Sequence, residues 1–73
     1  MDVRTLRYFI AIAKAENFTA AAEALHVTQP TLSKQMKELE EDLGKQLLIR
    51  GSRKVSLTAD GQLLQKRASE IID

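Results

Sequence analysis

Apolar residues recur with a helical period along most of the chain. A first helix is predicted for residues 2–17, where apolar side chains three or four positions apart share one face. That face carries Leu6, Phe9, Ile10 and Ala13. Tyr8 and Ile12 form a second, shorter stripe. An apolar arc of this width predicts that the helix contacts two different elements.

A short second helix is predicted in the segment AAAEALH, with Thr19 as its N-cap because a threonine hydroxyl accepts from the free amides of a first helical turn. Ala21, Ala22 and Leu25 would face inward. Alanine at these positions lets another helix approach closely. Alanine also occurs simply because it is a strong helix former.

The chain must reverse direction at His26, a residue type that tolerates positive φ, and Val27 would fill the turn. Thr28 is predicted to cap a third helix with Pro30 in its first turn, where a missing N–H has no cost. Gly44 would end that helix. Its inward stripe would be Leu32, Met36, Leu39 and Leu43.

A two-stranded hairpin is predicted next, because the apolar run 47–49 and the alternating segment 55–57 flank the turn-like sequence RGSRK. Thr58 would cap a final helix, with Asp60 in its first turn. The apolar positions of that helix are Leu63, Leu64, Ala68, Ile71 and Ile72. Because the helix reaches Asp73 without a C-cap signal, we expect it to be truncated.

This order of elements predicts a mostly α fold: a winged helix-turn-helix of three helices with a two-stranded β-hairpin wing, followed by the start of a final helix. We expect residues 1–57 to form the winged domain and residues 58–73 to form this final helix.

Composition narrows the function classes. A chain of 73 residues has little room for a deep enzyme pocket, and we expect no catalytic function. It has no cysteine and one histidine, so neither a thiolate zinc site nor a multi-histidine metal site is expected, and no cofactor is predicted. We expect no signal peptide and no membrane span. The absence of cysteine fits a reducing cytoplasm.

The net charge of +1 is uninformative, but charge is unevenly distributed. Residues 26–37 and 43–58 contain no acid. Four acids lie between them, Glu38, Glu40, Glu41 and Asp42. In a recognition helix the N-terminal part enters the major groove, so an acidic C-terminal part would limit the docking depth. Alternatively, the acids form a solvated helix end with i, i+4 pairs.

Side chains suited to DNA binding lie in the two segments that contain no acid. Gln29 can bond adenine bidentately, and lysine can reach guanine or phosphate. The wing cations Arg50, Arg53 and Lys54 would flank the duplex at phosphates or the minor groove. The alternative for this loop is an ordinary basic surface.

The segments FTAAAEALHVTQPTLSKQMKELEEDLG and LLIR, followed by VSLTADG, closely resemble the N-terminal DNA-binding domain of LysR-type transcriptional regulators. The resemblance implies a pseudo-palindromic operator of double-stranded DNA, a homodimer, and a small-molecule effector bound by a C-terminal domain absent here. Lys34 stands where the family more often has arginine, which favours phosphate contact over base reading. The DNA-binding residues expected from the pattern and the resemblance are Thr28, Gln29, Pro30, Thr31, Ser33, Lys34, Lys37, Arg50, Arg53 and Lys54.

The final helix resembles the family's linker helix, which pairs domains into dimers, and the resemblance implies that residues 58–73 are the N-terminal part of that linker helix. We expect an antiparallel pair through Tyr8, Ile12, Leu64, Ala68 and Ile71. Two rival classes are a winged-helix protein-interaction module and a small enzyme or ligand-binding domain. The first usually lacks a basic wing and recognition face, and no pocket chemistry supports the second.

Overall fold

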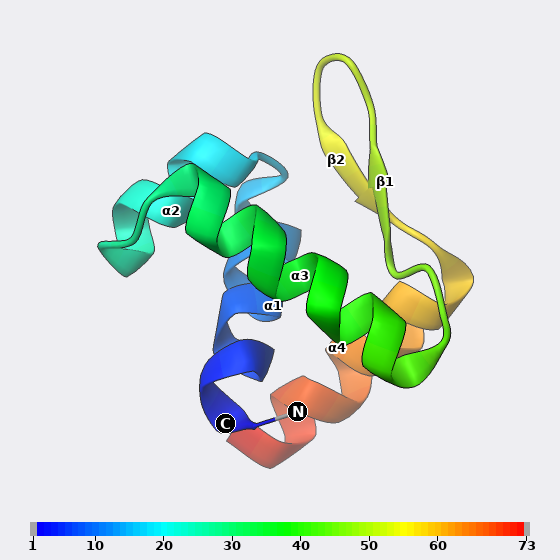
Figure 1. The fold of residues 1–73 in the computed structure, drawn as a ribbon. Helices are drawn as coiled ribbons and strands as arrows, with labels where there is room; N and C mark the ends of the chain where they lie inside the picture. The colour runs from blue at the N-terminus through cyan, green and yellow to red at the C-terminus, as the bar shows by residue number, and fades with distance from the viewer. Residues whose placement is uncertain (1, 73) are drawn as a thin grey trace.

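A computed structural model describes residues 2–72 of the chain. Within them it contains four helices and one antiparallel two-stranded sheet, as predicted (Figure 1). The elements are α1 (Val3–Ala15), α2 (Phe18–Leu25), α3 (Gln29–Leu43), β1 (Leu48–Arg50), β2 (Val55–Leu57) and α4 (Ala59–Ile72). This is the winged helix-turn-helix arrangement that the sequence predicted.

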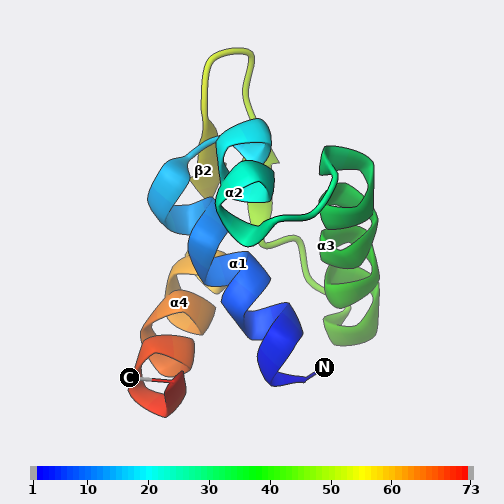
Figure 2. The same cartoon turned by 90° about the vertical axis from the view of Figure 1, so that its left-hand side faces the viewer.

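Helix α1 lies at the centre of the fold. Figure 2 shows it between α4 on one side and α3 on the other, and it packs against α2, α3 and α4. The wide apolar arc of α1 is thereby explained, because several neighbours cover it. The hairpin projects away from the helices on the side where α2 and the start of α3 lie (Figure 1).

The core is made by side chains of α1, α2, α3 and the hairpin, and Leu64 of α4 packs against it. Its buried cluster consists of Phe9, Ile12, Ala21, Ala22, Leu32, Met36, Leu39, Leu47, Leu48 and Val55. Two expectations about the stripes need correction. Ile10 is only half-buried whereas Ile12 is fully buried, so the main stripe of α1 is rotated toward Ile12. Leu43 is 39% exposed, because the last turn of α3 extends beyond the core.

The helix ends are determined by local side chains. Asn17, and not Thr19, caps α2: its Oδ1 accepts from the Ala20 N–H at 2.8 Å, so Thr19 lies inside the first turn. Thr28 caps α3 as predicted, accepting from the Thr31 N–H. His26 adopts the left-handed conformation expected of it, with φ of 60°.

Gly44 likewise ends α3 in the left-handed conformation, with φ of 64°. At the start of α1, Asp2 accepts from the Thr5 backbone N–H and from the Thr5 hydroxyl. These two bonds hold the pKa of the Asp2 carboxyl below its ordinary value. The stabilisation that they give is therefore present at neutral pH and is lost as the pH falls through the range in which this carboxyl titrates.

The hairpin is joined closely to α4. Its register pairs Leu48 with Leu57 and Arg50 with Val55. The Thr58 hydroxyl donates to the Gln46 carbonyl at 2.6 Å and accepts from the Gly61 N–H at 3.0 Å, which confirms Thr58 as the cap. Gly61 is buried against the chain entering β1. The wing therefore has a fixed base on α4.

In the part of the chain that the structure describes, no helix is long and apolar enough to cross a membrane.

Candidate nucleic-acid interface

A hollow of about 280 Å³ lies between the start of α3, the start of α2 and the wing. Five of the predicted DNA-binding residues line it: Gln29, Ser33, Arg50, Arg53 and Lys54. They come from two segments that are well separated in the sequence. The fold therefore brings the amide and hydroxyl groups of α3 opposite the wing cations.

The other five predicted residues lie in the first part of α3 and its cap without lining this hollow. All five are exposed, namely Thr28, Pro30, Thr31, Lys34 and Lys37. Thr28 and Thr31 are engaged with each other, since the Thr28 hydroxyl donates to the Thr31 hydroxyl at 2.8 Å. Their hydroxyls therefore serve the helix cap, whereas Lys34 and Lys37 extend into solvent.

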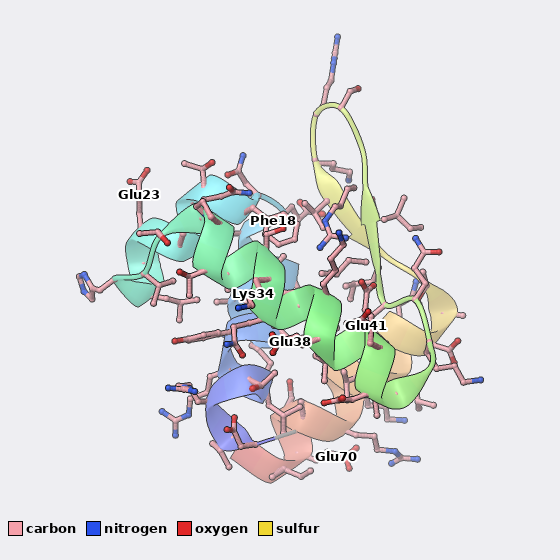
Figure 3. The ribbon with its side chains drawn as sticks, in the orientation of Figure 1. Phe18, Glu23, Lys34, Glu38, Glu41 and Glu70 are labelled. Atoms are coloured by element: carbon pink, nitrogen blue, oxygen red, sulfur yellow. The ribbon has the colours of Figure 1, made fainter. Side chains whose placement is uncertain are left out.

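The exposed face of α3 changes charge along its length. Figure 3 shows Lys34, Glu38 and Glu41 following one another toward the C-terminal end of the helix. Among the residues that the structure describes, the ion pairs join Arg50 to Glu40, Lys54 to Glu16 and Arg67 to Glu70. The alternative of i, i+4 pairing within α3 therefore receives no support. The cationic end of the helix is the end at the hollow.

The wing tip presents exposed cations. Arg53 is exposed on the loop between the strands. Lys54 is also exposed, but its Nζ lies 3.5 Å from the Glu16 Oε2 in the turn between α1 and α2. Because both side chains of this pair are largely solvated, the pair is weak and leaves Lys54 free to exchange partners.

Arg50 is placed differently from the other wing cations. Its Nη1 lies 3.8 Å from the Glu40 Oε1, and its guanidinium carbon lies 4.9 Å from the centre of the Phe18 ring. Phe18 is the first residue of α2 and lines the hollow together with the wing residues (Figure 3). Sequence reasoning missed Glu16, Phe18 and Glu40 as neighbours of the wing. Glu16 and Phe18 lie at the junction of α1 and α2, whereas Glu40 lies on α3, and no local pattern relates any of them to the hairpin.

The surface expected to form a dimer needs correction at two positions. Ile12 and Ala68 are fully buried inside the chain's own core, because α1 and α4 pack against each other. Neither side chain is available to a second copy. Tyr8 and Leu64 are half-buried, and Ile71 is 69% exposed. Leu63 is 53% exposed and adds an apolar side chain that was not in the expected set.

Comparison with known proteins places this arrangement in a family. A model described as "Bacterial regulatory helix-turn-helix protein, lysR family" matches residues 3–62. The chain is 51% identical over 73 residues to the Hca operon transcriptional activator HcaR of Escherichia coli K12, covering all of this chain and 25% of HcaR. It is 49% identical over 73 residues to the regulator BsdA of Bacillus subtilis 168, covering 99% of this chain and 25% of BsdA.

Solved structures agree with these relatives. The BenM_DBD/catB site 1 DNA complex superposes with a TM-score of 0.95 at 46% identity, covering 99% of this chain and 80% of that one. The CbnR_DBD–DNA complex gives a TM-score of 0.94 at 49% identity, covering 99% and 83%. The chain thus spans about a quarter of the length of the regulators HcaR and BsdA. Because the family model matches residues 3–62, and the relatives share both sequence identity and fold with it, the chain belongs to the lysR family of bacterial regulatory helix-turn-helix proteins.

Proposed function

We propose that this chain binds double-stranded DNA in a sequence-dependent way, as the DNA-reading domain of a bacterial LysR-type transcriptional regulator. The first half of α3 enters the major groove, and the wing lies on the flanking backbone or minor groove. The observation that carries the proposal is the hollow itself, where Gln29 and Ser33 of α3 face Arg53 of the wing.

The chemistry of the two sides suits two different tasks. An amide such as that of Gln29 can donate to and accept from one base edge, which gives sequence preference. An arginine on an exposed loop adds attraction to phosphate, which is independent of sequence. The acid-free first half of α3 avoids repulsion from the DNA backbone, and the exposed Glu38 and Glu41 lie at the end that leaves the groove.

The relatives also support DNA binding as the function. BenM and CbnR domains have been solved as complexes with DNA, and HcaR is a transcriptional activator of the Hca operon. We infer that this chain likewise acts by binding, not by catalysis, and that it works in the cytoplasm. A small-molecule effector would be bound by the part of such regulators that lies outside the length matched here.

The test uses DNA selected by the protein. Duplexes enriched from a randomised pool give a selected duplex, and a scrambled duplex of equal composition serves as the comparison. Affinity for both is measured by mobility shift at several salt concentrations. We expect tighter binding of the selected duplex and weaker binding of both as salt rises. Equal affinity for the two duplexes would contradict sequence-dependent binding.

The wing should supply affinity without sequence preference. Each phosphate contact contributes about −0.9 to the log–log slope of affinity against salt, which corresponds to roughly fivefold in affinity at about 0.15 M salt. We therefore expect Arg53→Ala to weaken binding about fivefold on both duplexes and to make the slope shallower by about one unit. Lys45→Ala is the matched control, since Lys45 is exposed but lines a different hollow.

Two other results would change this assignment. A loss confined to duplexes with A·T-rich flanks would place Arg53 in the minor groove. Unchanged affinity on every duplex would remove the wing tip from binding.

We further propose that the chain forms a homodimer through α4, which acts as the linker helix, on a pseudo-palindromic operator. Support comes from the exposed apolar side chains of Leu63 and Ile71, with Leu64 and Tyr8 beside the buried contact of α4 with α1. An antiparallel pair across a two-fold axis would cover them.

We expect Ile71→Asp to shift the chain toward monomer in sedimentation velocity at high concentration, because a charge would be buried in the pair. Ile49→Asp is the control, since Ile49 is 48% exposed and lies on the wing. A wild-type chain that is monomeric at every concentration would contradict the dimer.

A further inference from the structure

The carboxylate of Glu40 joins the recognition helix to the wing. Its Oε2 accepts from the backbone N–H of Leu47 at 2.7 Å and of Leu48 at 3.1 Å, where the chain enters β1. The side chain is only 15% exposed, so it is turned away from solvent, unlike Glu38 and Glu41 on the same helix. Hydrogen bonds to an ionised acceptor are about twice as strong as neutral ones.

Arg50 and Phe18 extend this connection to α2. Arg50 lies at the end of β1, with its Nη1 3.8 Å from the second oxygen of Glu40. Its guanidinium lies over the ring of Phe18, the first residue of α2, at 4.9 Å. One acid, one cation and one ring thus link α3, β1 and α2 around the hollow.

The wing depends on such links for its direction. Each of its strands has three residues, and an isolated two-stranded ribbon of this size is marginally stable in water. The other strand has its own link, because the Val55 N–H donates to the Glu16 carbonyl at 2.9 Å. Glu40 is the acid of α3 that fixes where β1 begins.

We propose that Glu40 is a positioning residue for DNA binding: with Arg50 it holds the wing tip at the distance from α3 at which Arg53 reaches the duplex. This inference rests on the proposed function. Arg50 then acts through Glu40 and Phe18, and it is not itself a contact to DNA.

The sign of the effect separates positioning from plain electrostatics. Glu40 is an acid close to a surface that faces phosphates, so removal of its charge alone would strengthen binding. Loss of positioning weakens binding instead, because Arg53 no longer reaches its contact. The two explanations therefore predict opposite changes from one substitution.

The experiment compares Glu40→Gln with Glu41→Gln on the selected and scrambled duplexes. The glutamine oxygen can still accept from Leu47 and Leu48, but the charge and the pair with Arg50 are lost. We expect Glu40→Gln to weaken binding up to about fivefold at about 0.15 M salt, with a shallower salt slope, as for loss of one phosphate contact. Glu41→Gln, the same change at an exposed neighbour on α3, should leave affinity unchanged or raise it.

Combining Glu40→Gln with Arg53→Ala shows whether Glu40 affects DNA binding through Arg53. In Arg53→Ala, where the wing contact is already absent, Glu40→Gln should cause no further loss. An equal loss in both backgrounds, or affinity equal to or above that of wild type, would overturn the positioning role. If wild type itself showed neither sequence preference nor salt dependence, the proposed function would fail instead.

Arg50→Lys tests the other side of the link and decides the question if Glu40→Gln does not fold by circular dichroism. Lysine keeps the positive charge but lacks the planar group that lies over Phe18. Positioning predicts weaker binding in Arg50→Lys, again absent in the Arg53→Ala background. Wild-type affinity in Arg50→Lys would mean that Arg50 serves only as a charge.

Discussion

Replacing Gln29 by alanine should reduce the preference for one base pair of the selected duplex by about 1–3 kcal/mol, or roughly 5- to 150-fold. Gln29 is exposed at the first position of α3 and lines the hollow opposite the wing. Its amide can make two bonds to one adenine edge. Alanine makes neither, so the protein would lose its discrimination at that base pair and keep its attraction to the backbone.

The measurement is the affinity of wild type and Gln29→Ala for a panel of duplexes that differ from the selected one at single base pairs. Gln35→Ala is the matched control, because Gln35 lies on the same helix but lines a separate hollow beside Asp2. We expect a flat response at one position for Gln29→Ala and an unchanged profile for Gln35→Ala. An equal loss on every duplex would mean that Gln29 only orients the helix.

Gly61→Ala should destabilise the fold by about 1–3 kcal/mol or more, the usual cost of inserting atoms into a packed site. A Cβ at Gly61 would lie 2.2 Å from the Leu47 carbonyl oxygen and 3.3 Å from the Leu57 Cβ. The first of these is a backbone atom, so it cannot be relieved by a side-chain rotation. Either α4 or the start of the wing would have to move.

Helix propensity predicts the opposite sign, because alanine is favoured over glycine by about 1 kcal/mol within a helix. Denaturant unfolding of wild type, Gly61→Ala and Lys66→Ala distinguishes the two. Lys66 is an exposed residue of the same helix, where alanine should change stability by less than about 0.5 kcal/mol. A Gly61→Ala chain as stable as wild type would show that α4 and the wing are not packed this closely.

Several parts of the fold follow from signals that lie within a few residues of each other. The left-handed His26, the Thr28 cap and the Gly44 terminus were predicted because each is a local backbone requirement. Asn17 was missed for a related reason: Asn17 and Thr19 are both suitable caps, and the sequence does not state at which one the helix begins. In the structure the cap is Asn17, because its Oδ1 accepts from the Ala20 N–H at 2.8 Å.

The DNA-binding side chains of the candidate site were also predictable from their residue types. The acid-free stretch through Gln29 and Ser33 and the cations around Gly51 suit DNA by residue type alone. What these segments lacked was a relation to one another. They meet at one hollow because α3 packs against α1 and α2 and because the hairpin packs against α1 and α4. These contacts join segments that are distant in the sequence.

By itself, the sequence determined the order of the elements, most of their ends and the chemistry of the recognition helix, because periodicity, caps and charge are properties of neighbouring residues. Only the tertiary structure decided which apolar and charged side chains are enclosed. Ile12 and Ala68 belong to the same apolar stripes as the more exposed Tyr8 and Ile71, yet they are fully buried in a fold where α1 packs against α4. Glu40 and Glu41 are adjacent acids, yet only Glu40 meets the N–H groups of Leu47 and Leu48. A helical period shows which face of a helix is apolar. Which element covers that face is decided by packing between segments that are distant in the sequence.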